Sequence, residues 1–267
     1  RPLPRGEPAA TLPLDYLQRH VDLALEARAA APWAAAVPWP LFLEAVLPHA
    51  SLDEPRDEWR PLLRAALADR VADAGSLGEA AQRVNRDVWG IWNITFRPEQ
   101  TPAIMSPTQV IKAGYASCTG LSIFLVDACR SVGIPARVVG TPKWLRYDAS
   151  KVSGNHDWVE VWDGSGWSFT GAAEYSPEGL NRSWFVPEPA AAQVEGSREH
   201  AIYAARYKPA KVNATWFPLA WSAYDGVPAE DVTRMYTARA DGAGDATAHG
   251  SHRAMSDGSF GAADRVR

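Results

Sequence analysis

The sequence is poor in cysteine, which limits how the chain can be stabilised. Its two cysteines are Cys118 and Cys129. If both lie on one helix, their separation of 11 residues corresponds to about 16 Å, whereas a disulfide needs Cα atoms within about 7 Å. We therefore expect two free thiols and no disulfide framework, which disfavours a small disulfide-stapled domain but does not exclude secretion.

Long hydrophobic runs and an excess of one charge are also missing. The most apolar stretch, residues 34–47, is interrupted by Pro38, Pro40 and Glu44 and falls short of the roughly 18 residues that a membrane span requires. The formal net charge of -4 gives no electrostatic reason to expect a nucleic acid or an anionic membrane as partner. We therefore predict no nucleic-acid partner and no membrane span.

Metal-ligand patterns are absent as well. Three histidines, His200, His249 and His252, lack the company and spacing of metal ligands, so no metal site and no cofactor are predicted. The chain begins at Arg1 rather than Met, so a signal peptide removed from a precursor would leave no trace. The compartment therefore stays open between a secreted or periplasmic location and a cytoplasmic one.

The first part of the chain carries helical periodicity, with apolar residues three and four positions apart from Leu14 to Leu25. Helices are predicted over residues 14–30, 41–47, 57–74 and 80–92, with a proline-rich loop or kinked connection over 31–40. Ser76 and Glu79 form a capping-box pattern before the last of these helices. We expect residues 1–100 to be a helical N-terminal region packed on the core.

The middle of the chain predicts one short helix and one central helix. Ser106-Pro-Thr-Gln109 is a second capping-box pattern, and Gly114 suits a left-handed C-cap. The next helix begins near Cys118 and runs to about Ser131, with an apolar stripe that predicts burial. Gly133 ends this helix.

Beyond Gly133 the pattern becomes that of strands. Strands are predicted over residues 135–140, 156–162 and 167–171, and the last two form a hairpin through the turn at 163–166. A further strand or extended wrap is predicted over 216–224. We expect a core and C-terminal wrap over residues 101–237, and a disordered tail or linker over 238–267, which lacks periodicity.

Cys118 and His156 are the candidate nucleophile and base. A nucleophilic thiol works as the thiolate, which a helix N-terminus favours, and Cys118 lies at the predicted start of the central helix. Cys118 falls on the apolar stripe of that helix, so we expect it to face the sheet. His156 is the first residue of the first alternating strand of that sheet. A thiol facing a histidine is the arrangement of thiol proteases and acyltransferases.

Glu174 is the candidate third member of the site. Pairing Trp162 with Trp167 places His156 opposite Ala173, and one bulge would bring Glu174 level with His156. A carboxylate there would accept a hydrogen bond from the imidazole and hold its tautomer. The alternative is a loop carboxylate that forms a salt bridge, for example with Arg182.

Four segments together resemble the transglutaminase-like superfamily. They are Gly-Tyr-Ala-Ser-Cys118-Thr-Gly, Ser131-Val-Gly-Ile-Pro-Ala-Arg-Val-Val, Asn-His156-Asp-Trp-Val-Glu-Val-Trp and Gly-Trp167. That superfamily includes animal transglutaminases, peptide N-glycanases and many bacterial proteins of uncertain substrate, and the resemblance covers about residues 104–186. It implies a papain-like α+β fold, in which a central helix carrying the cysteine packs on an antiparallel sheet, and a Cys-His-Asp triad.

The sequence departs from the family at one position. The family Asp lies four residues after the Trp of the second hairpin strand, and this chain has Gly171 there. Either Glu174 takes the role of that Asp or the triad is incomplete. Glu160 and Trp158 match the strand pattern of the family, where they are mostly structural.

Several other residues have two interpretations. Gln109 is either a capping residue or an oxyanion donor, and the capping-box pattern favours the capping role. The backbone N–H of Cys118 is the better candidate for the oxyanion donor. Cys129 is expected to be a core thiol. Five tryptophans either line an aromatic groove or belong to the core, and the core is the favoured interpretation. They are Trp89, Trp92, Trp144, Trp158 and Trp184.

The favoured hypothesis is a thiol-dependent amide hydrolase or acyltransferase that acts on peptide-like amides through a thioester on Cys118. Hydrolysis is preferred, because no site for an acyl-accepting amine is identified. One alternative is an inactive transglutaminase-like module that binds a peptide or a protein partner. Another is a structural component of a larger protein. The substrate would be a peptide or protein, and the oligomeric state stays open.

Overall fold

The computed structural model describes residues 12–99, 102–145, 154–208, 215–218 and 227–242 of the chain. Within these ranges the helices are α1 (Leu14–Ala30), α2 (Pro32–Ala35), α3 (Trp39–Ala45), α4 (Trp59–Val71), α5 (Leu77–Ile91), α6 (Pro107–Ala113), α7 (Cys118–Ser131) and α8 (Thr233–Gly242). The strands are β1 (Thr95–Phe96), β2 (Tyr115–Ala116), β3 (Ala136–Thr141), β4 (His156–Trp162), β5 (Trp167–Thr170), β6 (Tyr203–Ala205), β7 (Thr215–Trp216) and β8 (Pro228–Asp231). The mixture of helices and an antiparallel sheet confirms the predicted α+β class.

The main sheet has the strand order β5-β4-β3-β6-β8-β7 in the described ranges, and all its pairs are antiparallel. The hairpin pairs Trp162 with Trp167, as predicted, and the register continues without a bulge to the pair of Val159 and Thr170. His156 pairs with Thr141 on the other side of β4. The strand that carries His156 therefore lies inside the sheet, between β5 and β3.

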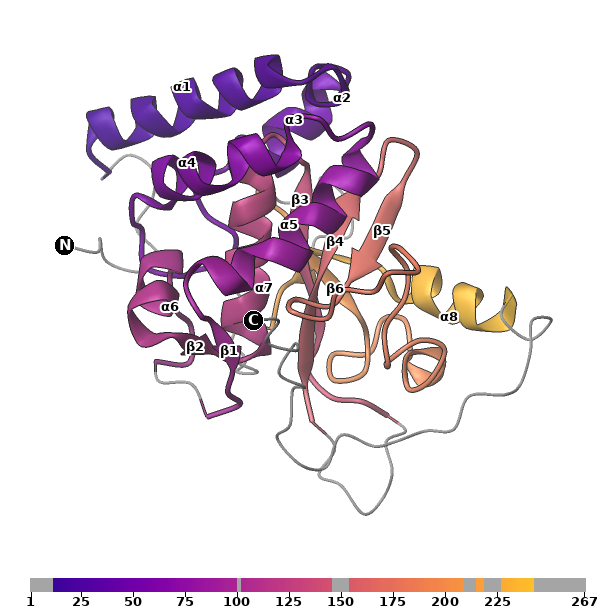
Figure 1. Ribbon diagram of the computed structural model, residues 1–267. Coiled ribbons are helices and arrows are strands. Elements are labelled where there is room, and N and C mark those ends of the chain that lie inside the picture. The colour runs from indigo at the N-terminus through magenta and orange to yellow at the C-terminus, as the bar shows by residue number, and fades with distance from the viewer. Residues whose placement is uncertain (1–11, 100–101, 146–153, 209–214, 219–226, 243–267) are drawn as a thin grey trace, which may run out of the picture.

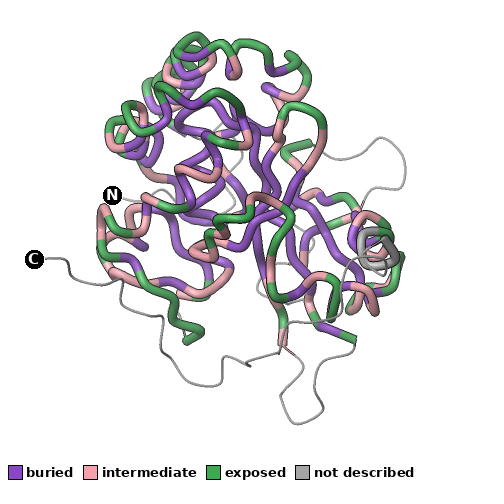
Figure 2. The backbone as a smooth tube through the Cα atoms, turned by 45° about the vertical axis from the view of Figure 1, so that its right-hand side comes forward, coloured by how far each residue is buried: buried purple, intermediate pink, exposed green. Residues whose placement is uncertain are grey.

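Helix α7 lies at the centre of the molecule, between the N-terminal helices and the sheet (Figure 1). Every residue from Thr119 to Ser131 is buried. Figure 2 shows the same arrangement as buried backbone enclosed by exposed segments. A helix enclosed in this way presents apolar side chains in all directions, so it packs on helices on one side and on β3 and β4 on the other.

The two faces of the sheet carry different cores. Val138, Val159 and Val161 pack against α7 and the N-terminal helices. The opposite face carries a largely aromatic cluster that lies under α8, with these main members: Trp144, Trp158, Phe169, Phe185 and Tyr236. The result is three layers, with helices on one face and α8 and its adjoining loops on the other (Figure 1).

Local signals place most helix ends where they were predicted. The Ser76 hydroxyl accepts the N–H of Glu79 at 3.1 Å, and Gln109 Oε1 accepts the N–H of Ser106 at 2.9 Å. Gly114 has the left-handed φ of 72° expected of a C-cap. These bonds satisfy backbone groups that a helix end would otherwise leave without a partner. The bond from the Ser106 N–H to Gln109 Oε1 confirms that Gln109 is a capping residue.

The structure differs from prediction near both ends of the chain. The segment expected to be a loop over 31–40 contains α2, which begins at Pro32, a favoured first helical residue. Helix α8 extends to Gly242, into the segment expected to be a tail, and residues 243–267 lie outside the described residues. Strands β6 and β8 were not predicted, and the predicted strand over 216–224 lies largely outside the described residues.

Two buried arginines tie the N-terminal helices to α7. Arg60 of α4 donates hydrogen bonds to the carbonyls of Val46, Leu47, Pro48 and Arg130. Arg130 of α7 donates to those of Ala45, Ala50 and Ala136. Burial lowers the pKa of Arg130, and the buried acids Asp127 and Glu54 oppose that shift. The loop over residues 45–50 is thus held by guanidinium groups rather than by regular secondary structure.

We expect Arg60→Met to lower the free energy of unfolding by about 3–5 kcal/mol, because it leaves the buried carbonyls of Val46, Pro48 and Arg130 without their donors. Urea unfolding followed by circular dichroism measures this change. The matched control is Arg64→Met on the same helix, whose ion pair with Glu26 is 3.8 Å long and lies at the surface. It should cost about 1 kcal/mol or less. Equal losses in the two variants would contradict the role assigned to Arg60.

Candidate active site

Cys118 is the first residue of α7, as the sequence predicts, and Ser117 is its N-cap. The thiol is partly exposed and lies against the start of β4, where it meets the backbone N–H of Asp157 and the hydroxyl of Thr119. The helix end therefore points the sulfur at the residue that follows His156. This contact joins the candidate nucleophile to the candidate base strand.

The surroundings of Cys118 favour the protonated form of its thiol. Burial raises its pKa to about 12, and the carboxyl of Asp157 raises it further, against the smaller lowering effect of the hydrogen bonds from Asp157 N–H and Thr119. The sequence predicts a thiol activated by the helix N-terminus. Desolvation and the neighbouring carboxyl outweigh that effect here, because an anion buried beside a second acid is costly.

His156 is the first residue of β4, and its ring lies within the aromatic cluster. Ring centroids of Trp184, Phe185 and Trp158 lie 5.0, 5.4 and 5.7 Å away. Burial lowers the pKa of His156 to about 3, and its Nε2 atom is buried without a hydrogen-bond partner in the described residues. The imidazole is therefore neutral at physiological pH and keeps a nitrogen free to accept a proton.

Cys118 and His156 meet at one end of β4 from different faces of the sheet. Asp157 bonds to Thr119 of α7, and successive strand side chains point to opposite faces, so His156 points toward the aromatic cluster. Among the hydrogen bonds of the described residues, none joins the Cys118 thiol to the His156 ring. The backbone N–H of Asp157 meets the thiol, and His156 precedes Asp157 on the strand. The facing arrangement of Cys118 and His156 stays a prediction.

Glu174 and His156 both contact the indole of Trp184. Glu174 Oε2 accepts a hydrogen bond from the Ser183 hydroxyl at 2.9 Å, and Glu174 Oε1 accepts one from Trp184 Nε1 at 3.2 Å. The Trp184 ring in turn contacts His156. These partners differ from the direct hydrogen bond expected between Glu174 and His156. The alternative salt bridge between Glu174 and Arg182 is not observed either, because Arg182 pairs with Glu178.

Glu174 occupies the space that a side chain at position 171 would need. A Cβ atom at Gly171 would overlap Glu174 Oε2 and lie 2.8 Å from Glu174 Cβ. Burial raises the pKa of Glu174, and the hydrogen bonds from Ser183 and Trp184 oppose that shift. The carboxyl that follows Gly171 in the chain thus folds back over the position where the family carries its Asp.

Asn85 of α5 holds the turn that presents Glu174. Its Nδ2 donates to Thr170 Oγ1 and to the Gly171 carbonyl, both at 2.9 Å, and its Oδ1 accepts the N–H of Ala173 at 3.2 Å. The turn closes with the Glu174 N–H donating to the Gly171 carbonyl at 3.1 Å, and Ala173 adopts a left-handed φ of 64°. Sequence analysis did not identify Asn85, because nothing local links it to a turn that lies so far along the chain.

Asp157 was also missed, although a signal was present. The alternation of β4 places it on the same face as Val159 and Val161, which pack toward α7. An acidic residue on that apolar face is unusual, because burying a carboxylate without a partner is costly. The site therefore holds two carboxyls on the two faces of the sheet, the buried Asp157 and the partly buried Glu174.

The remaining candidates divide between core and surface. Cys129 is buried, and burial raises its pKa to about 12, which confirms it as a core thiol. Trp144 and Trp158 are core residues, and Trp89 and Trp92 pack on Phe124. Trp184 is the exception, because it is 45% exposed and lies directly over the candidate site.

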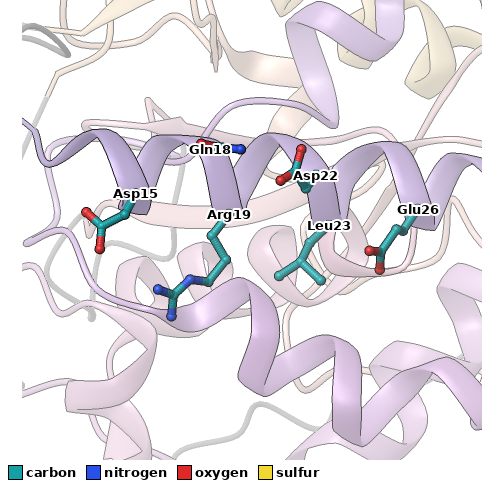
Figure 3. Close-up of a pocket in the computed structure, with 6 residues that line it drawn as sticks. All are labelled: Asp15, Gln18, Arg19, Asp22, Leu23 and Glu26. Atoms are coloured by element: carbon teal, nitrogen blue, oxygen red, sulfur yellow. The ribbon is translucent and has the colours of Figure 1, made fainter.

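Two grooves in the described structure lie away from this site. One runs along α1, is lined mainly by charged residues such as Asp15, Arg19 and Glu26, and has a volume of about 340 Å³ (Figure 3). The other, of about 490 Å³, lies between α3 and the sheet, beside Arg137 and Trp167. Neither is lined by Cys118, His156 or Glu174, so neither contributes to the candidate site.

The described residues contain no group of three or more His, Cys, Asp or Glu side chains placed to hold a metal ion. Their helices include none that combines the length and the apolar character needed to cross a bilayer.

The fold and the site define a class of α+β protein in which a cysteine at the start of a buried central helix lies beside a strand that begins with a histidine. Residues 65–171 match the family model of the transglutaminase-like superfamily, which confirms the resemblance drawn from the sequence. The matched residues include both Cys118 and His156. No curated protein matches the chain.

Two solved structures are similar over part of the chain. One is described as a "Putative Cysteine Protease from Cytophaga hutchinsonii", with 18% identity, 45% of this chain and 40% of that chain covered, and a TM-score of 0.34. The other is a "putative protease from Parabacteroides distasonis", with 11% identity, 43% of this chain and 23% of that chain covered, and a TM-score of 0.34. The chain thus spans less than half the length of either.

We expect iodoacetamide to label Cys118 faster than Cys129 in the folded protein at neutral pH. Burial raises the pKa of both thiols, but Cys118 is partly exposed at a helix end, whereas Cys129 is 1% exposed within the core. Mass spectrometry after brief treatment measures both positions, and denatured protein serves as the control in which both should label. Equal labelling of the two thiols in the folded chain would count against a reactive Cys118.

Proposed function

We propose that this protein is a thiol-dependent amide hydrolase or acyltransferase that acts on peptide-like amides. The observation that carries the proposal is the position of Cys118 at the N-terminus of buried α7, with its sulfur against the strand that begins at His156. The match of this segment to the transglutaminase-like superfamily supports it. Substrate and acyl acceptor are assigned by chemical class alone.

The proposed reaction proceeds in two stages through a thioester. The two side chains lie on different faces of the sheet in this structure, so the imidazole of His156 must first move within reach of Cys118. It then takes the thiol proton, and the sulfur attacks the amide carbonyl. The tetrahedral oxyanion then accepts a hydrogen bond from the Cys118 backbone N–H, and its collapse expels the amine, which takes the proton from His156. Water or a second amine then attacks the thioester and releases the thiol. Hydrolysis is the preferred outcome, because no site for an acyl-accepting amine is identified.

Glu174 is assigned as the residue that positions His156. It fills the space beside Gly171 and holds the Trp184 indole, which packs against the imidazole. A partly buried carboxyl so placed fixes the Trp184 indole next to the base. Asn85 supports this role by fixing the turn.

The second candidate function is an inactive module that binds a peptide or a protein partner. It is favoured by the absence of a Cys118–His156 hydrogen bond among the described residues and by the raised pKa of the thiol. Turnover separates the two functions. Profiling of cleavage and deamidation against a peptide library, with Cys118→Ala as control, should show products that the variant does not form. The same product profile from both proteins would overturn the proposed activity.

We expect Glu174→Gln to lower turnover sharply, because it removes the charge of the carboxyl that holds the Trp184 indole against His156. The matched control is Glu178→Gln, since Glu178 is an exposed carboxylate on the same loop that pairs only with Arg182, at 3.5 Å. It should keep turnover within about twofold. Thermal unfolding of both variants checks that the fold is retained. Wild-type turnover in a folded Glu174→Gln protein would remove Glu174 from the site.

We expect Gly171→Ala to lower turnover as Glu174→Gln does, because the new methyl overlaps Glu174 Oε2 and must displace the carboxyl. Gly166→Ala in the same hairpin is the control, since a Cβ there meets no atom within 4 Å. The double change Gly171→Asp with Glu174→Ala places a carboxyl at the family position in the vacated space, and it should recover activity relative to Glu174→Ala alone. Failure of Gly171→Ala to change turnover would contradict the assigned packing.

A further inference from the structure

The groove between α3 and the sheet is large enough for a small ligand and lies apart from the candidate active site. Its volume of about 490 Å³ falls within the range of small-molecule pockets. One of its lining residues is Arg137, near the start of β3, which pairs with Glu160 of β4. His156 pairs with Thr141 at the other end of β3. The groove and the candidate active site therefore lie toward opposite ends of this strand.

One wall of the groove is apolar. It consists of Pro40, Leu41 and Leu43 of α3 together with Trp167, a partly exposed residue at the start of β5. The guanidinium of Arg137 lies over the Trp167 ring, 4.2 Å from its centroid, and this cation–π contact holds the indole in place. An apolar group of a ligand would lose contact with water against these side chains, which favours binding.

Arg206 contributes a cation whose hydrogen-bonding capacity is not fully used. Its Nε atom is buried without a hydrogen-bond partner in the described residues. Its ion pairs with Glu44 and Glu230 are 3.6 and 3.8 Å long, beyond hydrogen-bond distance. Arg137, by contrast, donates to Glu160 and Glu230 at 2.8 and 3.0 Å. A buried donor without an acceptor is costly, and a carboxylate matches a guanidinium, so Arg206 is placed to receive the carboxylate of a ligand.

Glu44 and Glu230 line the same groove, and their carboxylates suit the ammonium group of a ligand. Glu44 accepts the N–H of Tyr207 at 2.9 Å and pairs with Arg206, both through Oε1. Glu230 pairs with Arg137 and Arg206 through Oε2. These bonds leave the second oxygen of each carboxylate able to accept a further hydrogen bond.

The balance of charge in the groove selects among ligands. The charged side chains that line it are three cations and two carboxylates: Arg137, Arg206, Lys208, Glu44 and Glu230. A polyanion would meet both carboxylates, and their repulsion opposes binding. A zwitterion finds an opposite charge for each of its ends, and an apolar side chain between those ends reaches the apolar wall. The groove therefore favours a ligand that has a carboxylate, an ammonium group and an apolar side chain.

We propose that this groove is a second binding site, which takes a free amino acid or a dipeptide with an apolar side chain. The carboxylate of the ligand binds Arg206, its ammonium group pairs with Glu44 and Glu230, and its side chain packs on the apolar wall. The site goes beyond the proposed function and does not depend on it, because it involves no bond to Cys118 or His156.

Isothermal titration calorimetry of the full chain with the dipeptide leucyl-phenylalanine tests the site. The protein carries Cys118→Ala, so that the peptide is not consumed during the titration. We expect saturable binding, and the further change Arg206→Gln should weaken it by about tenfold or more, because a charge-assisted hydrogen bond to the peptide carboxylate is lost. An absence of saturable binding, or equal affinity with Arg206→Gln, would overturn the proposal.

The matched control for this variant is Arg234→Gln in the same background. Arg234 of α8 is exposed, pairs with Glu195 and does not line the groove. It should leave the affinity for the dipeptide unchanged, and thermal unfolding of both variants checks that the fold is retained. A loss of affinity in Arg234→Gln as large as that in Arg206→Gln would contradict the position assigned to the ligand.

Altered peptides provide a second measurement that does not depend on the folding of Arg206→Gln. N-acetylated leucyl-phenylalanine lacks the ammonium group, and the C-terminal amide of the dipeptide lacks the carboxylate. Glycylglycine keeps both charges but lacks the apolar side chains. Each should bind at least about tenfold more weakly than leucyl-phenylalanine, because one of the three contacts is lost. Equal affinity for any of them would overturn the contact that this peptide lacks.

Discussion

The complete burial of α7 is the constraint on which the rest of the structure depends. A helix enclosed on all sides must pack apolar side chains in every direction and find a partner for each polar group that it carries. The sheet supplies Val138, Val159 and Val161 on one side. On the other, Arg60 and Arg130 bind the carbonyls of the loop over 45–50, so the N-terminal helices are fixed to the same helix that carries Cys118.

The same enclosure shapes the chemistry of the candidate site. Desolvation raises the pKa of the Cys118 thiol and lowers that of His156, so both groups are neutral in the described state. Two glycines, Gly140 and Gly171, flank the start of β4 and give room to the carboxyls of Asp157 and Glu174. Each carboxyl lies beside one member of the Cys–His pair, so the departures from the family pattern are spatially connected to the residues that match it.

Much of this architecture is local in origin and could be predicted from the sequence. The bounds of α1 and β4 were predicted to the residue and those of α7 approximately, because helical or alternating periodicity is uninterrupted along each of them. Strands β6 and β8 and helix α8 were missed, because they depend on distant partners: Tyr203 pairs with Asp231, and Tyr236 donates a hydrogen bond to Glu160. Asn85 was missed for the same reason. Asp157 could have been found, since the alternation of β4 places it among valines.

The most direct test of the account is covalent capture of the nucleophile by a substrate-like electrophile, such as a peptide aldehyde or peptide nitrile, followed by mass spectrometry of the intact protein and its peptides. The account predicts one adduct, on Cys118, that forms much more slowly in His156→Ala and does not form on Cys129. An adduct that forms on Cys118 at the same rate in His156→Ala, or no adduct on Cys118 at all, would contradict the assignment of a cysteine–histidine active site.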